Sequence, residues 1–544
     1  LNQALFLLAS PVAADRVCGA LIVDTLTDEE ICAGMFFWVL HLRFCKTNDY
    51  AKAIKGSFSS STNGWIGLPK GIQEATMALI PLPPTPPPDG ADFDRLLKIL
   101  VQRSLKSREV FHRFYFGLKC ETSVGDAESD GIQAILDELV AAVQAGGYEE
   151  RIQMVRSQEA FLDKMTAMSR AHKPSTGSNI GATEFAKRLR EDGATWETLR
   201  GEWYPTDTYG TVANSVLEAI HVYPSSCYPI KAQFHVDRVV EGGGVVAVDV
   251  DVSVPVADDS SPLPRQTADH TEGGGLRQTK GLIFKIGDDL RQDNFVMCFA
   301  QTVHGILQAA QIDVTITTYD IVSLSGQVGA VEEVPRAKSI RQIRDEYSDW
   351  ALDFLKPSMT TEDDASATMD RLVKSCAGTA LFTYILGVGD RHLDNVMMTE
   401  DGVIFQVDFG YIFGKDPHVN KYKAPKIRLD ECVVHALGGA QSEHFQRMEA
   451  LCLRGFIALR RASSLLIRAI YHLKHSKLPS LINETKFKKR IDRVKKLLMW
   501  GGSKLPEGED SAILKFQEIL DDSRNHVLQP VVELLHQCST SFNL

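Results

Sequence analysis

The chain has 544 residues, of which 44% are hydrophobic and 24% charged, and its formal net charge at pH 7 is −11. This length predicts more than one domain, because a domain usually holds roughly 100 to 200 residues. The negative charge argues against a nucleic-acid partner, and any polyanionic partner would have to meet a local basic patch. The ten cysteines contain no CxxC pair, so they indicate reduced thiols of an intracellular protein and neither a zinc ribbon nor a disulfide framework.

The N-terminal third of the sequence has apolar residues at helical spacing. We expect a helical domain over residues 1–195, with residues 46–91, which end in the proline-rich "PLPPTPPPDG", as an insertion. No apolar run reaches the ~18 residues that a membrane span needs, and the longest, "AGMFFWVLHL", is typical of a core helix. A signal-peptide pattern is absent. Because the chain begins with Leu1 inside an apolar pattern, we expect a fragment of a longer protein.

The pattern changes near residue 205 to alternating and β-branched stretches. Those that predict strands are "YPIKAQFHVDRVV", "GGVVAVDVDVSVPV", "GLIFKIGDD" and "DVTITTYDIVSLS". Residues 255–280, rich in polar residues, Gly and Pro, predict a long loop, and "DNFVMCFAQTVHGILQAA" predicts a helix. From about residue 335 the chain is mainly helical to its end. This order predicts two lobes, over 205–334 and 335–544, with a site between them.

The stretch "GVGDRHLDNVMMTEDGVIFQVDFG", residues 387–410, concentrates polar groups around an expected β-hairpin. Asp and Asn are ordinary turn residues, so a purely structural explanation exists. Asp390 and Asn395, however, stand five residues apart, as the catalytic Asp and the metal-binding Asn do in the HRDxxxxN loop of protein kinases. Asp408 opens a DFG triplet after a strand and offers the oxygen ligand that Mg²⁺ prefers. The combination predicts phosphoryl transfer.

Two charged residues of the preceding lobe extend this constellation. Lys285 follows the apolar strand "GLIF", where a lysine can reach the α and β phosphates of a nucleotide. Asp293 follows eight residues later and is placed to hold that lysine by a charge-assisted contact. Alone, such a pair is more often a solvated surface ion pair, but its combination with residues 387–410 is far more specific.

The segment "SCAGTALFTYILGVGDRHLDNVMMTEDGVIFQVDFGYIFGKDP" resembles the catalytic core of the phosphatidylinositol 3-kinase family, in which DRH and a downstream Asn replace the protein-kinase HRD order. The resemblance implies a multidomain fold: an α-helical, solenoid-like accessory domain followed by a bilobal α+β kinase-like catalytic domain. It implies that Asp390 and His392 are catalytic, either one being the working base, while Arg391 braces the loop. It further implies ATP, and Mg²⁺ or alternatively Mn²⁺, the metal being held by Asn395 and Asp408.

The same family's nucleotide-binding features are found in the preceding lobe. "IFKIGDDLRQD" resembles its lysine strand and following helix, "YPSSCYPIK" its phosphate loop and "VGAVEEVPRAKSI" its hinge. The residues implied to bind ATP are Lys285, Asp293, Ser225, Ser226, Tyr319, Glu332 and Val334. The phosphate loop departs from the family pattern, because Pro224 and Tyr228 stand where lysines are expected. Backbone N–H groups remain suited to cradling a phosphate there.

Charge in the loop after Asp408 bears on the substrate. Relatives that act on a bisphosphorylated lipid carry two dense basic boxes there, whereas this chain has "GKDP", similar to the "GRDP" of the class III, vacuolar-sorting enzymes, and scattered cations. The expected head-group residues are Lys421, Lys423, Lys426 and Arg428. Plain phosphatidylinositol, phosphorylated at its 3-hydroxyl, is the economical interpretation; a solvated loop is the structural alternative.

Several functions stay open on the sequence alone: a class I or II 3-kinase, a 4-kinase, or a related Ser/Thr protein kinase. A scaffold that has lost activity would lack Lys285, Asp390, Asn395 or Asp408, and all four are present. The class III resemblance implies phosphatidylinositol in membranes as substrate, and a role in endosomal or vacuolar trafficking and autophagy. It implies a kinase-like regulatory subunit and autophagy or endosomal adaptor subunits as partners, and a cytoplasmic enzyme peripheral on endosomal, vacuolar or autophagic membranes. The basic run "KFKKRIDRVKK" is expected to be a solvated helix face, with membrane contact as the alternative.

Overall fold

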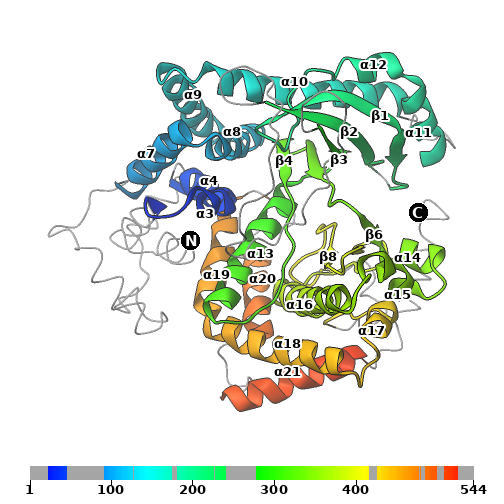
Figure 1. Cartoon of the computed structure of the whole chain (residues 1–544). Coiled ribbons are helices and arrows are strands. Elements are labelled where there is room, and N and C mark those ends of the chain that lie inside the picture. The colour runs from blue at the N-terminus through cyan, green and yellow to red at the C-terminus, as the bar shows by residue number, and fades with distance from the viewer. Residues whose placement is uncertain are drawn as a thin grey trace. The chain divides into compact units, whose positions relative to one another are not determined.

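The computed structural model of the chain describes residues 23–45, 91–126, 128–173, 181–225, 227–239, 277–415, 426–476, 478, 484–498 and 508–524. Two compact units are present (Figure 1). The hairpin unit comprises Leu1–Leu96, Phe295–Thr318 and Arg336–Leu544, and the sheet unit comprises Leu97–Asn294 and Tyr319–Pro335. Nearly all of the insertion expected over 46–91, the expected strand "GGVVAVDVDVSVPV" and most of the expected loop over 255–280 lie outside the described residues.

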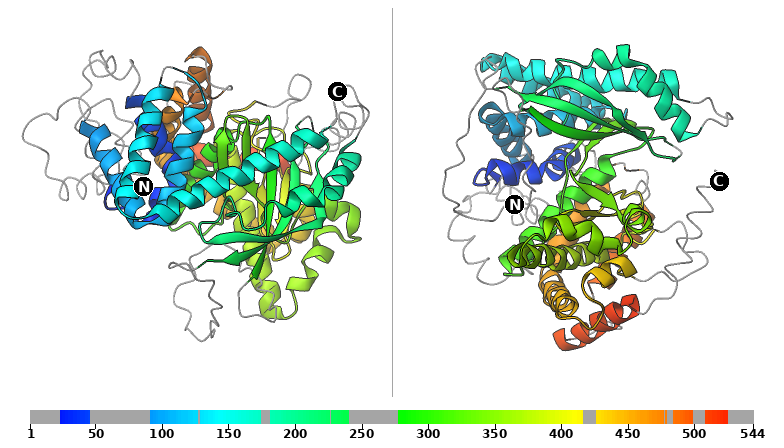
Figure 2. Two further views of the ribbon diagram at one scale, coloured as in Figure 1. Left: turned by 90° about the horizontal axis from the view of Figure 1, so that it is seen from above. Right: turned by 45° about the vertical axis from the view of Figure 1, so that its right-hand side comes forward.

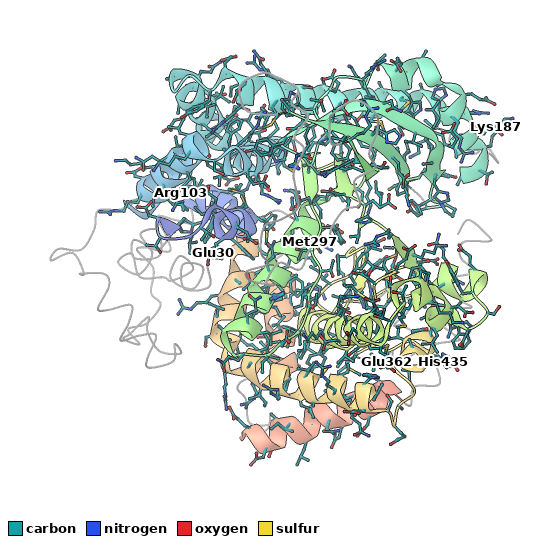
Figure 3. All side chains as sticks on the ribbon, in the orientation of Figure 1. Glu30, Arg103, Lys187, Met297, Glu362 and His435 are labelled. Atoms are coloured by element: carbon teal, nitrogen blue, oxygen red, sulfur yellow. The ribbon has the colours of Figure 1, made fainter. Side chains whose placement is uncertain are left out.

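The helical part of the sheet unit consists of amphipathic helices whose apolar faces pack together. They are α7 (Ala91–Lys106), α8 (Arg108–Thr122), α9 (Ser129–Ala145), α10 (Glu149–His172), α11 (Ala182–Glu191) and α12 (Gly193–Glu197), and the division between the units falls within α7. Ser107 caps the N-terminus of α8, because its hydroxyl accepts a hydrogen bond from the Val110 N–H. The helix packs on α9 and α10. Arg103 of α7 and Lys187 of α11 lie at opposite ends of this unit (Figure 3).

The sheet of this unit has five antiparallel strands in the order β1-β2-β3-β5-β4. They are β1 (Gly210–Val222), β2 (Ile230–Arg238), β3 (Arg277–Ile286), β4 (Ile321–Ser325) and β5 (Val328–Glu332). Every second side chain of β2, from Ile230 to Val236, is buried, as one covered face of a sheet requires. α10 runs across that face (Figure 1, Figure 2), where the Phe161 ring meets Phe234 at 5.5 Å between centroids.

The hairpin unit is mainly helical and has one small sheet, β6-β7-β8. Its elements are α3 (Asp28–Ala33), α4 (Met35–Cys45), α13 (Arg291–Ala309), β6 (Ala337–Ser339), α14 (Ile340–Glu346), α15 (Trp350–Leu355), η1 (Lys356–Ser358), α16 (Glu362–Leu386), β7 (Val396–Thr399), β8 (Ile404–Gln406), α17 (Glu431–Ala436), α18 (Glu443–Arg461), α19 (Ser463–Tyr471), η2 (His472–His475), α20 (Glu484–Leu497) and α21 (Glu509–Arg524). The first turn of α13 belongs to the sheet unit. α16 is its central helix: every residue from Ser375 to Leu386 is buried, and the helix packs on α18 and β8.

The expected core helix is confirmed as α4. Phe37 and Trp38 are fully buried, and the Trp38 indole N–H donates to the Ile31 carbonyl at 3.0 Å across the break at Gly34. The Phe37 ring also packs edge-on against Phe295 of α13. In the part of the chain that the structure describes, no helix has the length and apolar character needed to cross a membrane.

Three strand assignments made from the sequence need correction. β1 was not anticipated, because register shifts after Val212 and Val216 interrupt the alternation of its side chains. β3 begins at Arg277, inside the expected loop. In "DVTITTYDIVSLS" only Ile321–Ser325 forms a strand, because the preceding residues pair with a helix instead: the Thr315 N–H donates to the Lys374 carbonyl of α16 at 3.2 Å.

Candidate active site

The hairpin expected over residues 387–410 is confirmed in the hairpin unit. β7 pairs antiparallel with β8 from Val396 opposite Gln406 to Met398 opposite Ile404, and β6 pairs with the other edge of β7. Ahead of the hairpin, α16 ends at Gly387, whose φ of +60° lets the chain leave the helix sharply. Residues 387–395, the DRH loop, and residues 407–410 after β8 therefore meet at one end of the hairpin.

Two aspartates at this end have left-handed backbones, Asp390 with a φ of +53° and Asp408 with a φ of +59°. L-residues other than glycine rarely adopt this conformation, although Asp and Asn tolerate it best. Asp390 is half-buried and Asp408 is exposed, with its Oδ1 accepting a hydrogen bond from the Gly410 N–H at 3.2 Å. Backbone strain of this kind persists where the surroundings hold it and where function needs it.

Asn395 joins the two aspartates. Its side-chain Nδ2 donates to the Asp390 carbonyl at 2.9 Å, and its own carbonyl accepts from the Val407 N–H at 3.1 Å, next to Asp408. Because the amide nitrogen is used within the loop, Oδ1 is the atom of Asn395 that suits a metal ion. The described residues contain no group of three or more His, Cys, Asp or Glu side chains arranged for a metal. An amide oxygen with one carboxylate fits Mg²⁺, which completes its shell with phosphate oxygens and water.

Arg391 is buried under this end of the hairpin, with 6% of its surface exposed. It donates to the carbonyls of Gly389 (2.7 Å) and Val407 (2.9 Å), to the Gln406 side chain (3.3 Å) and to the Asp408 carbonyl. Its guanidinium also lies over the Phe409 ring at 5.5 Å. A single planar fork thus ties the start of the DRH loop to the residues after β8.

His392 is also buried, with 9% exposed. Its Nδ1 accepts a hydrogen bond from the Asp394 N–H at 3.3 Å. The Asp394 carboxylate lies beside the same ring nitrogen, with its Oδ2 3.5 Å from Nδ1.

In the sheet unit, Lys285 lies on β3 opposite Gly329 of β5, with 14% of its side chain exposed. Its ammonium donates to Asp288 Oδ2 at 2.9 Å, a partner that sequence reasoning did not single out. Asp293, the partner suggested by the sequence, is buried in the first turn of α13. Gly287, with a φ of +85°, turns the chain between Lys285 and Asp288. A glycine between a lysine and an aspartate three residues later was the sequence signal that could have indicated this ion pair.

The expected hinge residues lie at the end of β5 and beyond it. Tyr319, Glu332 and Val334 are each partly exposed. The Glu332 N–H donates to the Asp320 carbonyl at 2.8 Å, so this donor is already used within the sheet unit. Burial raises the pKa of the Glu332 carboxyl, and Lys280, with Nζ at 3.5 Å, opposes this.

The expected phosphate loop is the turn between β1 and β2. The Tyr228 N–H donates to the Ser225 carbonyl at 3.1 Å, and Tyr228 has a φ of +51°, whereas Ser226 lies outside the described residues. Lys173, which follows α10, donates to the Cys227 carbonyl at 3.5 Å and has its ammonium 5.7 Å from the centre of the Tyr228 ring. The turn itself lacks lysine, and a lysine 54 positions before Cys227 reaches it; the sequence held no signal for this contact.

Of the expected head-group residues, Lys421 and Lys423 lie outside the described residues, while Lys426 and Arg428 lie just ahead of α17. Partial burial, with Lys515 and Arg493 nearby, lowers the pKa of Lys426. The basic run on α20 is partly packed: Phe487, Ile491 and Val494 are buried. Arg490 of the same helix donates to the Phe413 carbonyl at 3.2 Å, so α20 is more than a solvated face.

Residues 279–482 match the family described as phosphatidylinositol 3- and 4-kinase. The yeast phosphatidylinositol 3-kinase VPS34 (Saccharomyces cerevisiae) is 35% identical over 266 residues, which is 48% of this chain and 29% of the relative. Phosphatidylinositol 3-kinase pik3 of Schizosaccharomyces pombe is 26% identical over 457 residues, 81% of this chain and 50% of the relative. Phosphatidylinositol 3-kinase VPS34 of Arabidopsis thaliana is 32% identical over 269 residues, 49% of this chain and 31% of the relative.

These matches confirm the resemblance to the phosphatidylinositol 3-kinase family, and the relatives named VPS34 support the class III type within it. The matched segment includes most of β3, the DRH loop and the β7–β8 hairpin. The chain spans half or less of the length of the relatives compared above.

Proposed function

We propose that this chain is a lipid kinase that transfers the γ-phosphate of ATP to the 3-hydroxyl of phosphatidylinositol, giving phosphatidylinositol 3-phosphate. The observation that carries the proposal is the gathering of Asp390, Asn395 and Asp408 by the two hydrogen bonds of Asn395. Phosphoryl transfer asks a protein for a residue that orients the nucleophile and for oxygen ligands to a divalent cation, and this group supplies both. The family match of residues 279–482 supports the same reaction class.

The nucleotide is bound through charge and hydrogen bonds. Asn395 Oδ1 and the Asp408 carboxylate hold the cation, Mg²⁺ or alternatively Mn²⁺, which when bound neutralises charge on the phosphate oxygens. Lys285 adds a positive charge on the phosphates, and Asp288 fixes its ammonium. The further ATP contacts that we assign come from Asp293, Ser225, Ser226, Tyr319, Glu332 and Val334.

The DRH loop holds both candidate bases, Asp390 and His392. His392 is buried, and its Nδ1 accepts a hydrogen bond from the Asp394 N–H. We assign the role of base to the half-buried Asp390 carboxylate, which takes the proton from the attacking hydroxyl, with His392 beside the transferred phosphoryl group. Arg391 holds the loop through its backbone contacts and acts as a positioning residue.

Plain phosphatidylinositol is the acceptor that we propose, with Lys421, Lys423, Lys426 and Arg428 as head-group residues. The names of the relatives support this choice and, with it, action on endosomal, vacuolar or autophagic membranes. A kinase-like regulatory subunit and adaptor subunits belong to the same proposal. So does the domain organisation, with a solenoid-like helical domain over 1–195 and kinase lobes over 205–334 and 335–544.

The test is an assay of the purified chain with Mg-ATP and vesicles of phosphatidylinositol, resolving the 3-phosphate from the 4-phosphate product. Vesicles with the 4-phosphate and the 4,5-bisphosphate lipids run in parallel, and Asp408→Asn controls for contaminating kinases. Product at the 3-position of plain phosphatidylinositol, lost in the variant, is the expected result. A 4-phosphate product, preference for the bisphosphate, or phosphorylation of protein alone would each replace the proposed substrate.

A further inference from the structure

Helix α8 (Arg108–Thr122) packs on β4 of the sheet unit, beside the strands that carry Lys285 and Glu332 (Figure 1). Most of its buried residues are apolar and serve the core. Its C-terminal end and its middle, however, also present charged or polar side chains to the sheet. The contacts that these side chains make fall on segments directly adjacent to the proposed nucleotide-binding residues.

The C-terminal end of α8 contacts the loop after β3 through a buried charge cluster. Arg291 donates to both oxygens of Asp289, at 2.9 and 2.7 Å, and to Glu121 Oε1 of α8 at 3.4 Å. The side chains of Arg291 and Glu121 are 7% and 4% exposed. Buried charges are costly unless they are paired and hydrogen-bonded, so an arrangement of this kind holds its members in one geometry.

Two members of this charge cluster, Asp289 and Arg291, follow Lys285 closely in the sequence. Lys285 is the penultimate residue of β3, Asp288 accepts a hydrogen bond from its ammonium, and Asp289 accepts from Arg291. Of these two successive carboxylates, Asp288 therefore contacts Lys285, and Asp289 contacts the arginine that binds α8. The turn between β4 and β5 is tied to the same helix end, because Ser123 Oγ accepts from the Gly326 N–H at 3.1 Å.

The middle of α8 makes a second connection. Arg113 donates to Asp320 Oδ1 at 2.5 Å and is held by Glu109 at 2.9 Å within its own helix. The Asp320 carbonyl accepts from the Glu332 N–H, and Asp320 directly follows Tyr319. The expected hinge residues Tyr319 and Glu332 are therefore connected to α8 through Asp320.

We propose that α8 positions the nucleotide-binding residues of the sheet unit, and that Glu121, acting through Arg291 and Asp289, sets the place of the Lys285 ammonium. This inference rests on the proposed role of Lys285 at the ATP phosphates. Glu121 and Arg291 are positioning residues, because each acts on the nucleotide through another side chain. A change in α8 would alter ATP affinity without touching the nucleotide.

Glu121→Gln is the variant that tests this. It keeps the shape of the side chain and leaves the Arg291–Asp289 pair neutral overall, so the core is disturbed little. Glu159→Gln is the matched control, since Glu159 of α10 accepts from Tyr115 of α8 at 3.0 Å and pairs with Lys119 at 2.8 Å, away from the loop after β3. The measurement is the Kd of Mg-ATP for the full chain by equilibrium titration, which requires no lipid substrate.

We expect Glu121→Gln to raise the Kd about fivefold to tenfold, the effect of losing one coupled contact of roughly 1 kcal/mol. Glu159→Gln should leave the Kd unchanged. In a Lys285→Met background, Glu121→Gln should add less than about a further twofold, because the route through the lysine is already lost. A general loss of packing would instead add its full factor in both backgrounds.

An unchanged Kd in Glu121→Gln, or the same increase with and without Lys285, would overturn the positioning role of α8. If Lys285→Met alone leaves the Kd unchanged, the nucleotide role of Lys285 is wrong and the inference falls with it. Should Glu121→Gln fail to fold, Ser123→Ala removes a link from the same helix end to the β4–β5 turn. We expect it to raise the Kd about twofold to threefold, and no change there would count against the inference.

Discussion

Arg391→Lys is the substitution that tests most directly how the DRH loop is held. Arginine at this position reaches two segments at once, Gly389 on one side and Gln406 to Asp408 on the other. Lysine keeps the positive charge and the length but donates from a single nitrogen, so it cannot span both segments. The variant therefore separates the fork geometry from the charge.

The size of the effect follows from the four hydrogen bonds of Arg391, which connect to three backbone carbonyls and one side chain. An ammonium in the same place keeps two of them at best. At about 1 kcal/mol net for each lost bond, the held geometry loses about 2 kcal/mol. If that geometry is needed in the transition state, kcat falls by roughly 30-fold.

The assay is steady-state phosphorylation of phosphatidylinositol vesicles, with kcat and the KM for ATP determined separately, and urea unfolding of the same samples. Arg371→Lys is the matched control, because Arg371 of α16 donates to the Asp401 carbonyl at 2.7 Å at the opposite end of the hairpin. We expect the control to keep its kcat. An Arg391→Lys enzyme with kcat within about threefold of the parent, or an equal loss in Arg371→Lys, would refute the reasoning.

Three further outcomes can be measured. Lys173→Gln should raise the KM for ATP about threefold, as for an exposed charge contact of under 1 kcal/mol, whereas Lys187→Gln on α11 should not. In urea unfolding, Gly378→Ala should cost about 2 kcal/mol, because its Cβ would lie 2.1 Å from the Thr315 carbonyl oxygen, whereas Gly193→Ala has room. Burial lowers the pKa of His112, so the neutral side chain favours the folded state above pH 6.5. The free energy of unfolding should therefore decrease as the pH falls below 6.5, and it should decrease less steeply in His112→Asn.

Much of the fold follows from local pattern. The buried helix α4, the helix α13, strands β2 and β3 and the hairpin of β7 and β8 were all predicted, because each is defined by the spacing of apolar residues within one short segment. The polar residues of the DRH loop were found for a related reason, since Asp390 and Asn395 are close in sequence. β1 was not predicted because its bulges interrupt the two-residue alternation of side chains by which a strand is recognised.

What the sequence could not provide is contact between distant positions. Glu121 meets Arg291 across 170 positions, and Lys173 reaches the Cys227 carbonyl across 54. Neither pair shares a periodic pattern or a motif, and each side chain alone is an ordinary charged residue on a helix or after one. The roles assigned to these residues are therefore proposals that depend on the tertiary structure.

The two left-handed aspartates explain why the DRH loop needs such strong support. Glycine at residues 390 and 408 would adopt φ values of +53° and +59° with no strain, whereas an L-residue in that region costs roughly 1 to 2 kcal/mol. In the reaction that we propose, the two carboxylates serve there as base and metal ligand, so the strain has to be offset by neighbouring contacts. Arg391 binds the carbonyl of Asp408, and Asn395 binds the carbonyl of Asp390, which places a hydrogen bond on each strained peptide. A variant that weakens either contact should therefore lower kcat more than it lowers the stability of the whole chain, since the strain is released locally.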